Sequence, residues 1–323
     1  MSTDDVGDAL GTAAEAIGAA DTVALACHVS PDGDALGSML ALHHGLRAAG
    51  RPSVASFPTP LVVAAHYREL PGLDLLTSPG DFPSEPDVMV TFDCGSVARL
   101  GDLEPAARAA RELVVLDHHI SNDRYGTINV IDPNAAATAV VVRRLMHELS
   151  LPLTQKSAVC LYAGLVCDTG RFQYTTTTPE VFRLAAELVG YGVPVESLSR
   201  TLFEEHRFAY LQLVADVLGR AELCADQRFV WASVTLADLE RHDVTIDEAE
   251  GLIDLVRRTA EAEVACVLKE EPDGSLRVSL RSLGGVDVRL IAEREGGGGH
   301  RFAAGFTSAG AIPDVVARIR AAL

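Results

Sequence analysis

The chain has 323 residues and a formal net charge of −18, with 48% hydrophobic and 22% charged residues. This length predicts two domains, each able to form its own core. The negative charge argues against a protein that coats long DNA or RNA, because neutralising phosphates requires a basic face. No apolar run is long enough to span a membrane, and the acidic N-terminus lacks the basic start of a signal peptide, so we expect a cytoplasmic protein.

The N-terminal half predicts short apolar strands that alternate with helices. We expect helices at 1–20, 35–49, 135–149 and 155–167, and strands at 23–26, 53–57, 88–92, 112–116 and 128–131. Strands that are apolar throughout and alternate with helices indicate a parallel α/β sheet. In such sheets, ligands bind beyond the carboxyl ends of the strands.

The C-terminal third predicts a different, smaller α/β domain. A helical stretch at 179–225, broken at 191–194, precedes strands expected at 229–234, 264–268 and 276–280 and helices expected at 248–259 and 313–322. We therefore predict a catalytic domain over 1–190, a helical linker over 191–215 and a second domain over 216–323. We expect the active site in the cleft between the two domains.

Residues that can hold metals follow several of the predicted strands. His28, Asp32 and Asp34 come after the first strand, and Asp93 comes after the strand at 88–92. Carboxylates two residues apart repel each other unless a cation offsets their charge. Asp-x-Asp alone is a weak signal for a metal, Asp168-Thr169-Gly170 alone could be a helix cap or a turn, and the four glycines that begin at Gly296 could be a flexible linker. The six cysteines form no C-x-x-C pair, so a zinc cage is not expected.

Two sets of motifs carry a family resemblance. The first set, His28-x-x-x-Asp32-x-Asp34-x-x-Gly37-Ser38, Asp93, Asp117-His118-His119 and Asp168, resembles the four motifs of the DHH phosphoesterase superfamily. The second, Gly296-Gly297-Gly298-Gly299-His300-x-x-Ala303-Ala304-Gly305, resembles the signature of the DHH-associated C-terminal domain. The resemblance covers nearly the whole chain, and the motifs occur in the family's order.

The resemblance implies a phosphoesterase that uses two divalent cations, with Mn²⁺ favoured over Mg²⁺ or Co²⁺. It implies that His28 and Asp32 hold one cation, that Asp34, His118 and Asp168 hold the second, and that Asp93 bridges them. A hydroxide activated by both cations would attack phosphorus. His119 would face the substrate phosphate, and Asp117 would orient the histidines. The residues expected to bind substrate are Arg281, Ser282, Gly297, Gly298, Gly299 and His300, with Arg99 as a weaker candidate.

Within the superfamily, the chain is similar to the short stand-alone oligoribonucleases (nano-RNases). Family II pyrophosphatases lack the glycine-rich His motif, and the long exonucleases have further modules. The membrane-bound cyclic-dinucleotide phosphodiesterases have segments before the first motif, which starts here at residue 28. We therefore expect short RNA, linear dinucleotides such as pApA, or 3′-phosphoadenosine 5′-phosphate as substrate, without long DNA or a membrane as partner. Homodimers occur in the family, so a homodimer is considered. Alternatives are a dedicated cyclic di-AMP phosphodiesterase and, more remotely, a non-catalytic nucleotide sensor.

Overall fold

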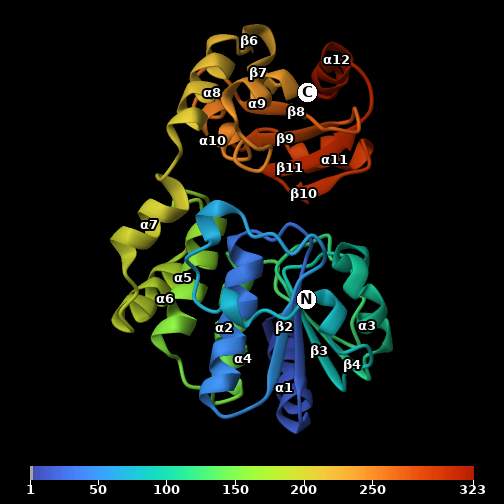
Figure 1. The fold of residues 1–323 in the computed structure, drawn as a ribbon, viewed down its shortest axis with the longest axis vertical. Helices are drawn as coiled ribbons and strands as arrows, with labels where there is room; N and C mark the ends of the chain where they lie inside the picture. The colour runs from blue at the N-terminus through green and yellow to red at the C-terminus, as the bar shows by residue number, and fades with distance from the viewer. Residues whose placement is uncertain (1–2) are drawn as a thin grey trace. The chain divides into compact units, whose positions relative to one another are not determined.

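The computed structural model describes residues 3–323, and the chain divides into two compact units (Figure 1). The N-terminal unit ends at Glu205, and the C-terminal unit is His206–Leu323. The division falls inside the segment expected as a linker. In the described part of the chain, no helix has the length and apolar character of a membrane span.

The N-terminal unit is built on one five-stranded parallel sheet, in the order β2-β1-β3-β4-β5. The strands are β1 (Val23–Cys27), β2 (Ser53–Ser56), β3 (Val88–Phe92), β4 (Glu112–Asp117) and β5 (Ile128–Ile131). The α-helices are α1 (Thr3–Ala19), α2 (Gly33–Ala48), α3 (Glu104–Ala109), α4 (Thr138–Glu148), α5 (Gln155–Asp168), α6 (Pro179–Gly190) and α7 (Val195–Phe203). Four short 3₁₀ helices are η1 (Ala65–Tyr67), η2 (Leu73–Leu75), η3 (Pro79–Asp81) and η4 (Val97–Leu103).

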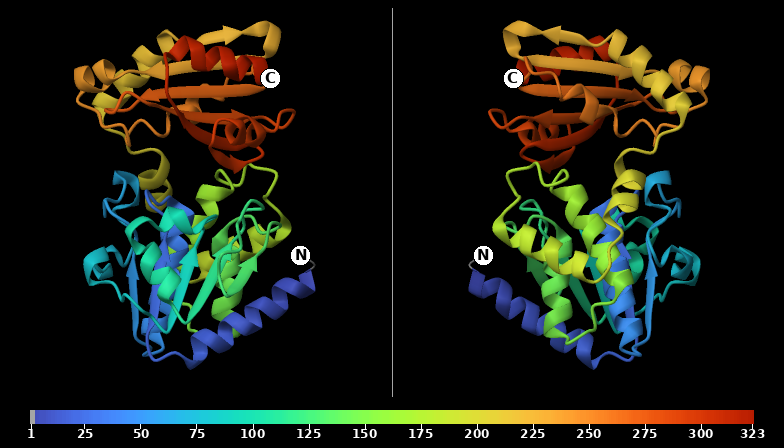
Figure 2. Two further views of the ribbon diagram at one scale, coloured as in Figure 1. Left: turned by 90° about the vertical axis from the view of Figure 1, so that its right-hand side faces the viewer. Right: turned by 90° about the vertical axis from the view of Figure 1, so that its left-hand side faces the viewer.

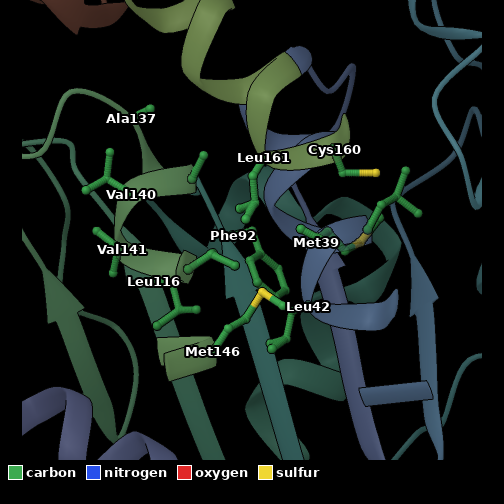
Figure 3. Packing of buried hydrophobic residues seen from close by; sticks show 14 of the residues in the cluster. Met39, Leu42, Phe92, Leu116, Ala137, Val140, Val141, Met146, Cys160 and Leu161 are labelled. Atoms are coloured by element: carbon green, nitrogen blue, oxygen red, sulfur yellow. The ribbon is translucent and has the colours of Figure 1, made fainter. Parts of the chain in front are cut away.

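Both faces of this sheet are covered, which explains why its strands are mainly apolar and why β1 and β3 are buried at every position. Val90, Phe92 and Leu116 pack into the larger core with α2, α4 and α5, and Figure 3 shows Phe92, Leu116 and Met39 among these packed side chains. Alternate residues such as Met89 point to the opposite face, where they meet η4 and α3. The sheet is thus a rigid layer, and its strand ends are held in place from both sides.

The strand order creates a natural ligand site. β1 lies between β2 and β3, so the chain leaves β1 toward one edge of the sheet and later returns on its other side. In open α/β sheets of this order, the crevice for ligands forms where the direction of winding changes, at the carboxyl ends of β1 and β3. His28 follows β1 and Asp93 follows β3, so both lie at this point.

The C-terminal unit is a six-stranded mixed sheet in the order β10-β11-β9-β8-β7-β6. Its elements are α8 (Phe208–Gly219), β6 (Glu222–Cys224), η5 (Ala225–Gln227), β7 (Phe229–Val234), α9 (Leu236–His242), α10 (Leu252–Val256), β8 (Val264–Glu270), β9 (Leu276–Ser282), α11 (Val288–Arg294), β10 (Gly298–His300), β11 (Ala303–Ser308) and α12 (Ile312–Ala322). Only β7 and β8 pair in parallel. Helices α8, α9 and α10 cover one face, and α11 and α12 pack on the other (Figure 2).

Residues along β11 alternate between two environments. Ala304, Phe306 and Ser308 are buried, and the first two lie in the core formed with α11 and α12. Ala303 is half-buried and Thr307 is exposed on the opposite face of the strand. This period of two is that of a strand with one face in a core.

The structure confirms the α/β class, but several local predictions were wrong. The helix expected at 248–259 is only Leu252–Val256, because Gly251 precedes it and the segment before it forms turns. The stretch expected to be helical to residue 225 ends with strand β6 at the sheet edge. The glycine-rich segment is not a free loop, because Gly298 pairs with Gly305 to form β10.

Candidate active site

The first candidate side chains come from the turn between β1 and α2. The Asp32 side chain caps α2 by accepting hydrogen bonds from the backbone N–H groups of Asp34 and Ala35, both at 3.0 Å. His28 is buried, and its Nδ1 lies 2.8 Å from the carbonyl oxygen of Val29. The other ring nitrogen, Nε2, lies 3.7 Å from an Asp93 carboxylate oxygen. The turn therefore aims one imidazole and one carboxylate at the end of β3.

Asp93 lies at the centre of the candidate site. Its backbone is in the left-handed region, with φ of 53°, directly after β3. An aspartate tolerates this conformation better than most residues, and such outliers concentrate at functional sites. One carboxylate oxygen lies 3.6 Å from His118 Nε2 and 3.4 Å from His119 Nδ1, and it accepts a hydrogen bond from Thr138 Oγ1 at 2.9 Å. The other oxygen faces His28, so the two oxygens of Asp93 point to different neighbours.

The histidine pair after β4 is held by Asp117, which is fully buried. One Asp117 oxygen accepts hydrogen bonds from the backbone N–H groups of His118 and His119 at 2.7 and 3.1 Å, and from His119 Nδ1 at 2.7 Å. His118 Nδ1 lies 3.2 Å from the carbonyl oxygen of Ala135, and its Nε2 lies 3.1 Å from Asp168. Both rings are thus fixed by contacts at Nδ1.

Asp34 is fully buried at the start of α2 and is bound by the first turn of α4. Its carboxylate accepts hydrogen bonds from the backbone N–H groups of Thr138 at 2.5 Å and Ala139 at 2.9 Å, and from Ser38 Oγ at 3.2 Å. The N-terminus of a helix stabilises negative charge, so α4 stabilises the ionised form of Asp34. Asp168, by contrast, ends α5, where a negative charge is unfavourable.

Burial has the largest effect on the pKa values of these aspartates, and the neighbouring carboxylates and imidazoles modify it. Burial raises the pKa of Asp34 well above its usual value, and the neighbouring carboxylates of Asp168 and Asp93 raise it further. Burial also raises the pKa of Asp168 to about 6, although the hydrogen bond with His118 opposes the change. Burial alone would raise the pKa of Asp93, but His119 and the other nearby imidazoles hold it well below its usual range. Asp93 is therefore the anionic centre of the group.

The donor set fits divalent cations. His28, Asp32 and Asp93 bring ligand atoms within 4.8 Å of one another, and so do Asp34, Asp93 and His118, so the two groups share Asp93. Hydrogen bonding at Nδ1 leaves Nε2 of His28 and His118 directed at the carboxylates, as metal-ligating histidines require. Carboxylate and imidazole ligands suit Mn²⁺ or Mg²⁺, and bound cations would offset the repulsion among the buried carboxylates.

Arg99 contacts the histidine side of this group. Its backbone carbonyl accepts a hydrogen bond from the Val29 N–H at 2.9 Å, and its guanidinium Nη2 lies 2.9 Å from His28 Nδ1. Arg99, considered from the sequence as a phosphate contact, therefore holds the turn after β1 through its backbone carbonyl.

The other residues expected to bind substrate lie on the C-terminal sheet. Arg281 on β9 pairs with Ala303 on β11, and Ala303 pairs with His300 on β10, so the three side chains share one row on one face. Ser282 points to the opposite face, where its hydroxyl donates to Glu263 at 3.2 Å. The alanine in the middle of the row leaves the face shallow between a guanidinium and an imidazole.

The glycines of this segment have different structural roles. A Cβ on Gly297 would lie 2.2 Å from the Gly305 carbonyl oxygen, and a Cβ on Gly299 would lie 2.6 Å from that of Ala303. A Cβ on Gly298 meets nothing within 4 Å. Gly297 and Gly299 are thus needed for the close approach of two strands, whereas Gly298 presents open backbone.

Sequence reasoning missed residues that hold the site without being ligands themselves. Thr138 binds Asp93 through its hydroxyl and Asp34 through its N–H, and Asn122 donates to Asp117 at 2.5 Å. The only sequence signal for Thr138 was its position in the first turn of a predicted helix, and for Asn122 its place three residues after the histidine pair.

Family models match both units of the chain. Residues 22–165 match the DHH family, N-terminal domain, and residues 226–323 match the DHHA1 domain. The chain belongs to the DHH family, and it is a metal-dependent hydrolase of that family.

Among similar proteins, the bifunctional oligoribonuclease and PAP phosphatase NrnA of Thermus thermophilus is 33% identical over 88% of this chain and 84% of its own length. The protein of the same name from Bacillus subtilis is 29% identical over 88% of each chain. In fold, the chain resembles an exopolyphosphatase-related protein from Bacteroides fragilis, with a TM-score of 0.89 over 98% of this chain and 95% of the other, at 23% identity.

Proposed function

We propose that this protein is a Mn²⁺-dependent phosphoesterase that hydrolyses short oligoribonucleotides and linear dinucleotides such as pApA, and also 3′-phosphoadenosine 5′-phosphate. The observation that carries the proposal is the pair of ligand groups that share Asp93 at the switch point of the sheet. The NrnA relatives, which are named as oligoribonucleases and PAP phosphatases, support this choice of substrates.

In this proposal, His28 and Asp32 hold one cation, Asp34, His118 and Asp168 hold the second, and Asp93 bridges them. When bound, such a pair of cations stabilises phosphoryl charge and supplies a hydroxide nucleophile near neutral pH.

His119 contacts the substrate phosphate. Burial would lower its pKa, but the charge of Asp93 and the hydrogen bond to Asp117 raise it, which favours a protonated ring suited to an anionic oxygen. Asp117 fixes the orientation of that ring.

The substrate is bound by Arg281, the Gly297–Gly299 backbone and His300, with Arg99 as a further phosphate contact. Ser282, which the sequence also suggested as a substrate contact, is left out of this proposal because it is buried on the opposite face and its hydroxyl donates to Glu263. Arg281 can form paired hydrogen bonds to a terminal phosphate. Two further parts of the proposal are a cytoplasmic location, which was expected from the acidic N-terminus and the lack of a long apolar run, and assembly as a homodimer, which rests on the family alone. The domain assignment proposed from the sequence, with a linker over 191–215, is kept as well.

The test is release of 5′-nucleotide from pApA with Mn²⁺. Asp93→Ala should reduce turnover below detection, because it removes the shared carboxylate. Asp132→Ala is the matched control, since Asp132 also lies directly after a strand but pairs with Arg144 at 2.6 Å. Equal activity of the parent and Asp93→Ala would refute the two-metal assignment.

A substrate panel separates the alternatives. Cyclic di-AMP, pApA, 3′-phosphoadenosine 5′-phosphate and di- to pentaribonucleotides are compared at one enzyme concentration. Preference for cyclic di-AMP would replace the proposal with a dedicated cyclic di-AMP phosphodiesterase. Tight nucleotide binding without turnover would indicate a sensor.

A further inference from the structure

Asn122, in the loop after β4, has a side chain with every polar atom in use. Its Nδ2 donates hydrogen bonds to the Asp117 carboxylate at 2.5 Å and to the Cys94 carbonyl oxygen at 3.1 Å. Its Oδ1 accepts from the backbone N–H of Arg124 at 2.7 Å. Because Oδ1 must face that N–H, the orientation of the amide is fixed by its partners.

The bond to Asp117 reaches the oxygen that the histidines do not use. The Oδ1 atom of Asp117 accepts hydrogen bonds from the backbone N–H groups of His118 and His119 and from His119 Nδ1. Asn122 donates to the other oxygen, Oδ2. A fully buried carboxylate needs donors at both oxygens, since an unsatisfied charged oxygen is costly in a buried site. Asn122 therefore fixes the rotation of the carboxylate about its Cβ–Cγ bond.

The second bond joins two loops. Cys94 directly follows Asp93, so Asn122 connects the loop after β3 to the loop after β4. Asp93 and the His119 ring lie 3.4 Å apart at the closest atoms, and Asn122 helps to hold this separation without contacting either side chain. The Asp123 N–H, which donates to the Gly95 carbonyl oxygen at 2.9 Å, joins the same two loops.

We propose that Asn122 is a positioning residue for phosphoester hydrolysis, acting through Asp117 on the His119 ring. The inference rests on the proposed contact between His119 and the substrate phosphate. Without the amide, Oδ2 of the buried Asp117 carboxylate loses its donor, so Asp117 holds the His119 ring less firmly. The side chains of His28, Asp32, Asp34, His118 and Asp168 keep the contacts described above. The loss should therefore fall on kcat, since misplacing a group that contacts the reacting phosphate slows the step more than it weakens binding.

The experiment compares Asn122→Ala with Asn122→Ser, which keeps a hydroxyl donor, and with Asn129→Ala. Asn129 on β5 is a matched control, because its side-chain amide also makes two hydrogen bonds, both to the Gly126 backbone, and it contacts none of the candidate site residues. We expect Asn122→Ala to lower kcat for pApA with Mn²⁺ by roughly 10- to 100-fold, with KM and calorimetric Mn²⁺ affinity changed less than about 2-fold. Asn122→Ser should recover part of the loss, and Asn129→Ala should keep the parent kcat.

A second readout does not depend on turnover. In the parent, the ¹H–¹⁵N signal of the His119 ring should report a proton at Nδ1 held by Asp117, and this signal should shift or broaden in Asn122→Ala and not in Asn129→Ala. Equal kcat losses in the two alanine variants, or an unchanged His119 signal in Asn122→Ala, would overturn the inference. If the parent hydrolyses none of the substrates, the proposed function fails by itself, and the His119 signal still decides whether Asn122 positions the ring.

Discussion

The carboxylate of Asp168 should destabilise the protein when no metal is bound. Burial raises its pKa from 3.8 to about 6, so the folded chain holds a proton that the unfolded chain has lost between these values. The free energy of unfolding therefore falls as pH rises through this interval. Above pH 6 the charged carboxylate lowers it by its full amount, at most about 3 kcal/mol. Asp168→Asn removes the charge, and its amide oxygen can still accept from His118. We expect the variant to be more stable than the parent in chelator at pH 8, by up to that amount, while losing activity.

The assay is urea unfolding in chelator, followed by circular dichroism at pH 8 and pH 5. The single tryptophan, Trp231, lies on β7 of the C-terminal unit, so its fluorescence follows that unit and should not change. Asp132→Asn is the control with the opposite sign. Its carboxylate accepts from Arg144 at 2.6 Å, so its loss should destabilise the protein by about 1 kcal/mol at pH 8.

Two results would refute this reasoning about Asp168. One is an Asp168→Asn variant no more stable than the parent in chelator at pH 8. The other is a gain of equal size at pH 5, where the parent carboxyl is largely protonated and the difference should shrink. With Mn²⁺ in excess the order should reverse, because binding stabilises the parent by mass action and the variant lacks a ligand.

Three further outcomes can be checked by unfolding measurements. His43 on α2 is buried with Nδ1 2.8 Å from Ser53 Oγ, and burial lowers its pKa to about 4, so stability should fall by up to about 3 kcal/mol as pH drops from 6.5 to 4. His43→Gln should flatten that part of the curve, and an unchanged slope would contradict the assignment. Gly297→Ala should lower the unfolding midpoint followed by Trp231 fluorescence, with a loss of unfolding free energy above about 2 kcal/mol, because its Cβ would meet the Gly305 backbone. Gly298→Ala should leave that midpoint unchanged, because its Cβ would meet nothing within 4 Å. Mn²⁺ should raise the urea concentration at the midpoint of the parent's circular dichroism transition, and it should leave the midpoint of Asp93→Asn unchanged.

The sequence was most informative where a side chain directly follows a buried strand. The run before Asp93 is apolar at four of the five positions of β3, the exception being Thr91, so its end could be found and the aspartate assigned to the sheet edge. The site itself was predicted through the family motifs, and their proposed roles remain to be tested.

The residues that were missed depend on which loops lie side by side. Asn122 binds Cys94, and Thr138 binds Asp34, across sequence separations of 28 and 104 residues. The strand order that brings these loops together cannot be deduced from the spacing of apolar residues within any one helix or strand. Strand β10 was missed for another reason, since glycines have low strand propensity and the pairing depends on close backbone contact with β11.

The alternation along β11 should divide the effects of mutation by residue parity. Even-numbered positions such as Ala304 and Phe306 face the core, so a saturation library should accept only apolar residues of similar volume there. At Ala303, on the face shared with Arg281 and His300, larger side chains should leave the fold intact and change only the capacity to act on nucleotides. Along this six-residue strand, substitutions at core-facing positions would lower the protein level in an abundance screen. Substitutions at Ala303 would instead lower catalytic activity in a growth screen and leave the protein level unchanged.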